Sequence, residues 1–588
     1  MIRSSHYRQG VVCSFYGFLC IFAQKICFCA YMIEQNFIRL YQDSFREHWA
    51  LPALTNYDTK ESYTYGEMAA DIARRHLLFE RIGLKPGDKV ALLGKDSAEW
   101  CMAFMSVITY GAIIVPVLPD FNAADAASIV THSDAKYLFV SDKIWETMDP
   151  SQLLLLCGAV SIRDYTVFLD RTEGGLLSRE VKGLSRSFSE RYPSGFTAED
   201  IRYAEVSNDD LILLNYTSGT TGFSKGVMLR ANNLAGNVTY VKDRDIMFRG
   251  ETILCFLPLA HTYSCAFNFL TPLTIGVHVY ILGKIPSPLT LIKAFADVHP
   301  SFVIMVPLII EKLYHKAIAP KIKTPLIKFL LRLPVLRKVI HKSIRSKLIE
   351  SFGGNFRQII IGGAALNDEV AHFLYRIGFP LTVGYGMTEC GPLISYEDHS
   401  LWLPGSCGKS LSIMEARIDH SGQERHSDSG DVGEIQVRGE NVCLGYYKNA
   451  ELTAELFTPD GWMRTGDLGT IDSLGNIFIK GRSKTMLLGS NGQNIYPEEI
   501  ESKINNLSYV LESIVTERDG RLIALIVPDR QAIEHKGISP DQAWAYIERS
   551  RAELNGQVGA YEKITAFVRH DEEFEKTPKR SIKRFLYT

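Results

Sequence analysis

The sequence predicts an α/β protein with a large N-terminal part, which holds two βαβ-type subdomains and a small β subdomain, and a small α+β C-terminal unit. Two strand–helix–strand patterns and a change to short strands and turns after Ser406 support this prediction. At 588 residues the chain is long enough for roughly two to four domains. An apolar content of 46%, a charged content of 22% and a formal charge of -2 exclude a disordered chain and leave no overall basic field for nucleic acid.

The first 31 residues differ from the rest of the chain. They hold four of the eleven cysteines and an apolar stretch from Gly10 to Ala23, which is shorter than the about 20 residues of a membrane-spanning helix. Either they form a weak hydrophobic anchor, or they are translated from an upstream start and the working protein begins at Met32. The abrupt change of pattern at Met32 favours the second interpretation. Four other cysteines lie in apolar surroundings and are expected to be reduced core residues of a cytoplasmic protein: Cys101, Cys255, Cys265 and Cys443.

Two βαβ units are expected. In the first, Asp96 with Glu99 three residues later predicts a helix start of the capping-box type. This helix runs to about Tyr110 between strands Lys89 to Leu93 and Ile113 to Val117. The second unit is expected to comprise strand Gln358 to Ile361, helix Asp368 to Ile377 and strand Pro380 to Val383.

The loop that follows the apolar run Leu211 to Leu214 has the composition of a phosphate-binding loop. Glycines let backbone N–H groups approach an anion, hydroxyls donate hydrogen bonds and a lysine supplies charge. A surface turn rich in Ser, Thr and Gly is the plainer alternative. Ser224 precedes the lysine and Gly226 follows it, so this is not a Walker A loop. Its candidate phosphate ligands are Thr217, Ser218, Gly219, Thr220, Thr221, Gly222 and Lys225.

Ligands of open parallel sheets lie beyond the carboxyl ends of the strands. The loops 362–365 and 384–389 are therefore expected to share a sheet edge with the phosphate loop.

Read whole, Leu213 to Leu229 resembles the signature loop of the adenylate-forming superfamily of acyl-CoA synthetases, with Ser224 where the family has proline. The resemblance covers nearly everything from Met32 to the C-terminus. It implies an AMP-binding adenylation domain with a small β-barrel over residues 32–481 and a mobile lid domain over residues 482–588, with residues 1–31 as an N-terminal extension. ATP, Mg²⁺ and CoA are the cofactors it implies.

The stretch Gly384 to Glu389 supplies a candidate metal ligand. Attack of a carboxylate on an α-phosphate brings anions together, and donors, lysines and a divalent metal must neutralise them. A single carboxylate suits Mg²⁺, so Glu389 is the metal candidate together with Thr217. Tyr385 offers a flat face for adenine and Thr388 a hydroxyl for phosphate, although a core tyrosine with a solvated glutamate is the plainer alternative. The stretch resembles the family's adenine and metal motif, and the nucleotide site is extended to Gly363, Ala364, Ala365, Gly384 and Gly386.

His261 and Asp467 are the other candidates for contact with substrates. A lone histidine after an apolar run is more often a core residue, but the resemblance places His261 beside the acyl carboxylate. Asp467, on a glycine-flanked turn, can accept both ribose hydroxyls and matches the family's ribose aspartate. By resemblance, Arg482 touches the ribose and Lys484 stands at the hinge of the lid domain.

The segment 321–347 is both basic and apolar and has no acidic residue. Such a segment suits the surface of an anionic bilayer, where each basic residue contributes about 1 kcal/mol. The alternative is a solvated helical face. The basic residues are Lys321, Lys323, Lys328, Arg332, Arg337, Lys338, Lys342, Arg345 and Lys347, and Leu326, Ile327, Phe329, Leu330, Leu331 and Leu333 lie among them.

The C-terminal tail departs from the family. Similar enzymes carry an adenylation lysine where this chain has Ser581. In an extended tail, side chains alternate, so Lys579, Ser581 and Lys583 would share a face. Lys583 is therefore the candidate for the adenylation charge and Lys579 the runner-up, with loss of the first half-reaction as the third alternative.

The resemblance implies an AMP-forming ligase that activates an acid with ATP and transfers the acyl group to CoA. The resemblance and the basic amphipathic segment together favour a long-chain fatty acid as that acid. A ligase that loads an acyl carrier protein is one alternative, and a catalytically weak nucleotide- or lipid-binding protein at the membrane is another. The expected location is cytoplasmic, with peripheral contact at the inner face of the cell membrane through 321–347. No nucleic-acid partner is expected, and the oligomeric state is left open.

Overall fold

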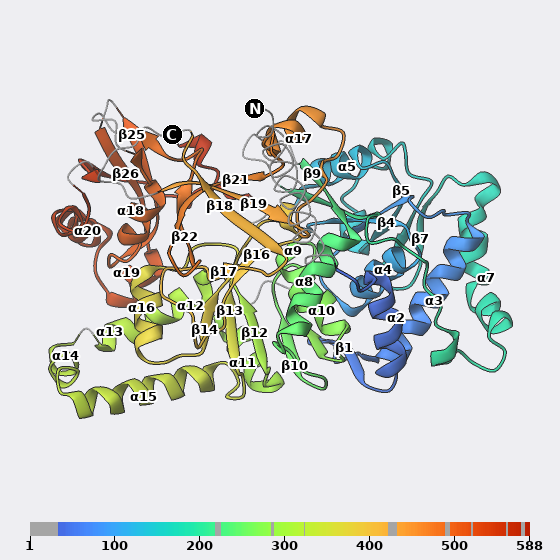
Figure 1. Ribbon diagram of the computed structural model, residues 1–588, viewed down its shortest axis with the longest axis horizontal. Helices are drawn as coiled ribbons and strands as arrows, with labels where there is room; N and C mark the ends of the chain where they lie inside the picture. The colour runs from blue at the N-terminus through green and yellow to red at the C-terminus, as the bar shows by residue number, and fades with distance from the viewer. Residues whose placement is uncertain are drawn as a thin grey trace, which may run out of the picture.

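The computed structural model describes residues 33–217, 225–283, 287–322, 324–421, 432–488, 494–518, 521–559, 562–577 and 582–587. The expected N-terminal extension, the phosphate-loop residues Ser218 to Ser224, Lys323, and Lys579 with Ser581 lie outside these ranges. Figure 1 shows the N-terminal elements at one end of the long axis and the C-terminal elements at the other, with the middle of the chain between them.

One large sheet carries the phosphate loop. Its strand order is β20-β9-β8-β4-β3-β5-β6-β7. The five adjacent strands β8, β4, β3, β5 and β6 run parallel to one another. β9 is antiparallel to β8, with Thr217 opposite Lys225, so the two ends of the phosphate loop are held side by side. The strands are β3 Lys89–Leu93, β4 Ile113–Val117, β5 Ala135–Val140, β6 Gly158–Ser161, β7 Val167–Asp170, β8 Leu211–Thr217, β9 Lys225–Arg230 and β20 Gly445–Tyr446.

A second large sheet has the order β14-β13-β12-β10-β11-β1-β2. Within this sheet, every pair of neighbouring strands is parallel except β1 and β2, which pair antiparallel. Because β13 and β14 belong to this sheet and β8 to the other, the expectation that their loops share one sheet edge is wrong. The strands are β1 Pro52–Asn56, β2 Ser62–Thr64, β10 Thr252–Cys255, β11 His278–Ile281, β12 Phe302–Met305, β13 Gln358–Ile361 and β14 Leu381–Val383.

The helix after β3 is capped differently from the prediction. The hydroxyl of Ser97 accepts a hydrogen bond from the N–H of Trp100 at 3.1 Å and caps α4. The carboxyl of Asp96 instead accepts from the N–H of Leu259 at 3.0 Å, on a loop of the second sheet. The capping-box prediction at Asp96 is therefore wrong, because a contact distant in sequence takes this side chain. The expected helix from Asp368 is present and ends at Arg376.

The other helices of the two large sheets are mostly short, and π-helical turns at Cys265–Leu270 and Tyr314–Ile318 interrupt two of them. Within the described ranges, no helix is long and apolar enough to cross a membrane. The helices are α2 Phe37–Glu47, α3 Tyr65–Arg81, α4 Ala98–Thr109, α5 Ala123–His132, α6 Asp142–Trp145, α7 Leu176–Arg191, α8 Ala231–Asp243, α9 Thr262–Ser264, α10 Thr271–Leu273, α11 Pro288–Val298, α12 Pro307–Leu313, α13 Ala319–Ile322, α14 Pro325–Leu330, α15 Pro334–Ser351 and α16 Asp368–Arg376.

Smaller antiparallel sheets follow in the chain. The order β18-β19-β21-β22 forms the expected antiparallel β unit after Ser406, next to the sheet β15-β16-β17. These elements are β15 Tyr385–Gly386, β16 Leu393–Tyr396, β17 Lys409–Ser410, β18 Met414–Asp419, β19 Gly433–Gly439, α17 Ala450–Leu456, β21 Met463–Ile471 and β22 Ile477–Arg482.

The C-terminal unit is α+β as predicted. The side-chain amide of Asn367, the N-cap residue of α16, donates to the carbonyl of Ser502 in α18 at 3.0 Å, which connects this unit to the second large sheet region. Its elements are β23 Leu487–Leu488, β24 Asn494–Ile495, α18 Pro497–Ile504, β25 Val510–Arg518, β26 Arg521–Pro528, α19 Arg530–Lys536, α20 Pro540–Asn555 and β27 Ala566–Arg569.

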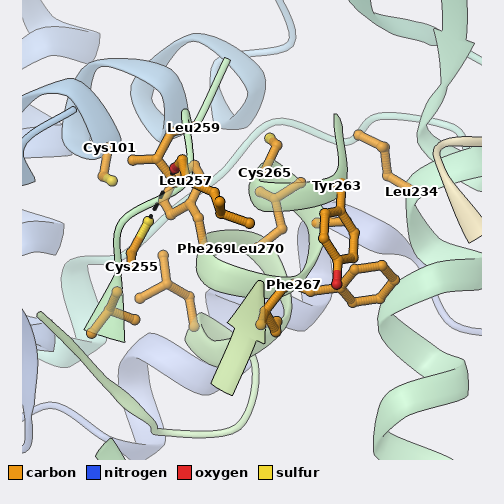
Figure 2. Packing of buried hydrophobic residues seen from close by; sticks show 14 of the residues in the cluster. Cys101, Leu234, Cys255, Leu257, Leu259, Tyr263, Cys265, Phe267, Phe269 and Leu270 are labelled. Carbon is orange, nitrogen blue, oxygen red and sulfur yellow. Dashed lines mark hydrogen bonds between the residues drawn. The ribbon is translucent and has the colours of Figure 1, made fainter. Parts of the chain in front are cut away.

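The core between the sheets contains the cysteines that were expected to be reduced. Cys101, Cys255, Cys265 and Cys443 are free and buried. Figure 2 shows the first three among leucines and phenylalanines of the segment around Leu257 to Leu270. This packing holds the turn that carries His261.

Candidate functional site

The site forms where the two large sheets meet. The side-chain amide of Asn215 on β8 donates to the carbonyl of Ala260, next to His261, at 2.9 Å. The N–H of Cys443 donates to the carbonyl of Glu389 at 2.8 Å, and the N–H of the next residue, Leu444, donates to Met228 on β9 at 3.0 Å. The phosphate-loop hairpin, the histidine turn and the glutamate turn are thus joined by hydrogen bonds.

Glu389 is fixed by a tyrosine that the sequence analysis missed. It lies in the 3₁₀ turn Thr388–Cys390 and is 9% exposed. The hydroxyl of Tyr446 donates to its Oε1 at 2.8 Å, and the Lys225 ammonium lies 5.0 Å from the centroid of the same ring. Burial raises the pKa of Tyr446, and the negative charge of Glu389 raises it further. The phenol therefore stays protonated and donates its hydrogen bond. Tyr446 joins the lysine of one motif to the carboxylate of another, and no local pattern in the sequence links them.

The residues present fit a magnesium ion. Within the described part of the chain, no group of three or more His, Cys, Asp or Glu residues could hold a metal by itself. Mg²⁺ is usually bound by one or two carboxylates together with substrate phosphates and water. Buried Glu389 supplies such a carboxylate, and Thr217 at the carboxyl end of β8 supplies a hydroxyl on the phosphate-loop hairpin.

Asp467 is held by Tyr385 and Arg482. The Tyr385 hydroxyl donates to its Oδ2 at 2.7 Å, and Arg482 Nε lies 3.1 Å from its Oδ1. β21 and β22 place Asp467 and Arg482 opposite each other. Burial raises the pKa of Asp467 and the arginine charge opposes that rise. The result is a carboxylate of fixed orientation that can accept hydroxyl groups.

A mostly apolar pocket lies beside these residues. His261, Tyr385 and Thr388 are among its polar lining residues. His261 Nδ1 accepts from the N–H of Tyr263 at 3.2 Å, so in the neutral ring the proton is on Nε2. The cavity therefore offers a polar end next to the nucleotide residues.

Two glycines of the cavity permit close packing of its walls. A Cβ at Gly386 would lie 2.3 Å from the carbonyl oxygen of Pro392, and one at Gly362 would lie 2.9 Å from the ring of Tyr263. Gly363, at φ +83°, and Gly384 also line the cavity. The glycines predicted in these loops therefore adjoin the site, whereas Ala364 and Ala365 are exposed on the same loop as Gly363 and do not line the cavity.

The structure does not bring Lys583 to this cavity. Its ammonium lies 3.3 Å from Glu575 Oε2. It lines a separate hollow with Lys576, Asp120 and Asp125. Ile582 forms an antiparallel bridge with Lys576. Since Lys579 and Ser581 lie outside the described residues, the expectation that Lys579, Ser581 and Lys583 share one face stays a prediction.

Lys484 is exposed on the turn after β22 and lies outside the cavity lining. Its expected hinge role remains a prediction.

This chain is similar in sequence to known proteins. The family described as "AMP-binding enzyme" matches residues 41–447. A long-chain-fatty-acid–CoA ligase, FadD15 of Mycobacterium bovis, is 28% identical over 80% of this chain and 78% of its own length. A 4-coumarate–CoA ligase of Nicotiana tabacum is 26% identical over 80% of both chains.

The fold is also similar to solved structures. ATP-bound MatB from Rhodopseudomonas palustris superposes with a TM-score of 0.72 at 22% identity, covering 93% of this chain and 98% of the other. This agreement confirms the predicted α/β architecture.

Proposed function

Because the chain belongs to the AMP-binding enzyme family and is an AMP-forming acid–CoA ligase, we propose that its acid substrate is a long-chain fatty acid. The observation that carries this proposal is the lining of the cavity beside His261. Among the described residues that line it there is no Asp, Glu, Lys or Arg. The wall thus provides no charged partner for a second ionised group on the acid.

The apolar wall comes from several elements. On β12, Phe302 and Ile304 line the cavity while Val303 between them does not, as the alternation of a strand requires. Val241 at the end of α8 and Met247 after it extend this wall. Each buried methylene contributes about 0.8 kcal/mol, whereas an unpaired charge would be strongly penalised. This wall favours an alkyl chain over a dicarboxylic acid.

The first half-reaction follows from the arrangement at the polar end. Tyr385 and Asp467 bind the nucleoside, with Arg482 fixing the carboxylate that accepts the ribose hydroxyls. His261 orients the acid through Nε2–H. The acid oxygen attacks the α-phosphorus while the bond to the pyrophosphate oxygen breaks, which yields acyl-AMP.

Lys225 and the phosphate loop hold the phosphate oxygens as charge builds up on them. Glu389 and Thr217 would hold a magnesium ion, which would supply positive charge to the same oxygens. Tyr446 keeps Glu389 in place for this role.

The second half-reaction needs access for a thiol. The CoA sulfur attacks the acyl carbon, and the bond from that carbon to the AMP oxygen breaks. We propose that the C-terminal unit, residues 482–588, rotates about Lys484 between the two steps. The exposed turn directly after β22 supports a hinge there.

A panel of acids tests the proposal. Pyrophosphate release should be fastest with palmitate, slower with 4-coumarate and slowest with malonate, and CoA should be needed for continued turnover. A preference for 4-coumarate or malonate would refute the long-chain assignment. Turnover with an acyl carrier protein but not with CoA would assign the thiol acceptor to that carrier, and no release with any acid would indicate a nucleotide- or lipid-binding protein.

A further inference from the structure

Helices α14 and α15 form an arm, residues 324–351, that projects from the second large sheet. Figure 1 shows α15 along the lower edge of the molecule and α14 at its outer end, away from both large sheets. Every residue from Arg332 to Val339 is exposed, so the first turn of α15 has no side that packs on the body. The first turn of α15 therefore does not anchor the arm to the body.

The apolar residues of the arm fall into two sets, one that packs on the body and one that is exposed. Ile340, Ile344 and Leu348, four residues apart, are half-buried or buried and hold α15 to the body. A second set faces solvent instead, with exposed fractions of 67% for Leu326, 58% for Phe329, 75% for Val335 and 60% for Val339. A helix stabilised only by packing on its own protein needs the first set and not the second. Exposed apolar side chains concentrated on one short segment, in contrast to single ones scattered over a surface, mark an interaction surface.

Basic side chains surround the exposed apolar ones. From residue 324 to 349 the chain has no Asp or Glu. The side chains of Lys328, Arg332, Arg337 and Lys338 are all exposed, and within the described ranges none of them forms a salt bridge or a hydrogen bond. Their charges are therefore available to an outside anion.

We propose that this arm docks on the surface of an anionic lipid bilayer, with Leu326, Phe329, Val335 and Val339 entering the headgroup–acyl boundary and the basic side chains contacting lipid phosphates. The charge of the arm complements anionic headgroups, and its exposed apolar residues need an apolar phase. A nucleic acid would neutralise the charges but would leave the aliphatic side chains in water. The proposal does not depend on which acid the enzyme activates.

Vesicle co-sedimentation with the full chain tests the proposal. The protein should bind vesicles of equal parts phosphatidylcholine and phosphatidylglycerol and bind pure phosphatidylcholine far more weakly. One variant replaces the basic residues Lys328, Arg332, Arg337 and Lys338 by Gln, and it should lose at least about tenfold in partitioning, with weaker salt dependence of what remains. A second variant replaces Leu326, Phe329, Val335 and Val339 by Ser and should lose a similar factor at high salt, where charge is screened.

A matched control replaces four basic residues of α7 by Gln: Arg179, Lys182, Arg186 and Arg191. Helix α7 lies at the opposite end of the molecule from the arm (Figure 1). This control variant should therefore bind vesicles like the parent. All variants should keep the parent's circular dichroism spectrum and its ATP-dependent pyrophosphate release.

Equal vesicle binding by the parent and both arm variants would overturn the proposal. Loss of vesicle binding in the basic variant alone, with binding by the serine variant unchanged, would also overturn it, because the apolar residues would then have no role. Binding to duplex DNA in place of vesicles would assign the arm to a nucleic acid and overturn it as well.

Discussion

At the scale of single residues, one hydrogen bond connects the two halves of the phosphate site. Tyr446 donates to Glu389 and lies beside Lys225. The sequence points to Glu389 and Lys225 through their motifs, but Tyr446 is found only when the strands are placed. Its neighbour Tyr447 makes a similar bond to Asp134 at 2.8 Å, away from the cavity. Removing the hydroxyl of Tyr447 therefore serves as a control for removing the hydroxyl of Tyr446.

Replacing Glu389 by Gln should lower acyl-AMP formation by about a hundredfold or more, since the charge that neutralises the phosphates is lost. Tyr446→Phe should lower it less, by about tenfold, because only one hydrogen bond to the charged carboxylate is removed. Tyr447→Phe is the matched control and should leave the rate near that of the parent. Pre-steady-state pyrophosphate release measures all three. A parent-like rate for Glu389→Gln would remove this residue from the mechanism.

Asp96 gives a prediction about pH. Asp96 is half-buried, and desolvation of its carboxyl raises the pKa to about 7, while the N–H of Leu259 opposes the rise. The unfolded chain loses this proton near the ordinary pKa of about 4, so between these values the folded state binds more protons and stability falls as pH rises. Asp96→Asn keeps an acceptor for Leu259 and has no charge to desolvate.

The Asp96→Asn variant should therefore unfold at a higher temperature than the parent at pH 8, with a smaller difference at pH 4. Thermal unfolding followed by circular dichroism at both pH values measures this. A variant less stable than the parent at pH 8 would show that the ionised carboxylate stabilises the fold.

At the scale of elements, local patterns predicted strands better than their assembly. The strands Lys89–Leu93 and Gln358–Ile361 were predicted to the residue, because buried parallel strands are continuous apolar runs bounded by turn residues. Which sheet each strand joins depends on pairing over long sequence distances, and the periodicity of a strand carries no information about it. The capping prediction at Asp96 failed for the same reason.

The C-terminal tail is the element whose role stays a prediction. Lys583 pairs with Glu575 in this arrangement, so it can contribute to adenylation only after the C-terminal unit has moved. Lys583→Ala should lower acyl-AMP formation while thioester formation from preformed acyl-AMP is retained, and Lys579→Ala should have a smaller effect. Lys536→Ala, on exposed α19, is the control. Normal adenylation by both tail variants would show that neither lysine takes the place of the family's adenylation lysine.

At the scale of the whole molecule, the two large sheets meet at a site with a polar end and an apolar end. The motifs along the chain point to residues of the polar end, because glycines, hydroxyls and carboxylates are recognisable locally, and the nucleotide role of these residues stays a prediction. The apolar end could not be predicted, since its wall combines β12, the end of α8 and the histidine turn, and none of these has a distinctive sequence. The basic and apolar character of the arm was evident from composition, and the structure adds that one group of its apolar residues, which includes Leu326, Phe329, Val335 and Val339, is exposed.

The most direct measurement of the central claim is to incubate the enzyme with palmitate, ATP and Mg²⁺ without CoA and to analyse the products by mass spectrometry. The account predicts pyrophosphate together with about one palmitoyl-AMP per chain, held until CoA is added and then converted to palmitoyl-CoA and AMP. Formation of ADP and phosphate, or of palmitoyl-CoA without any palmitoyl-AMP before CoA is added, would contradict it.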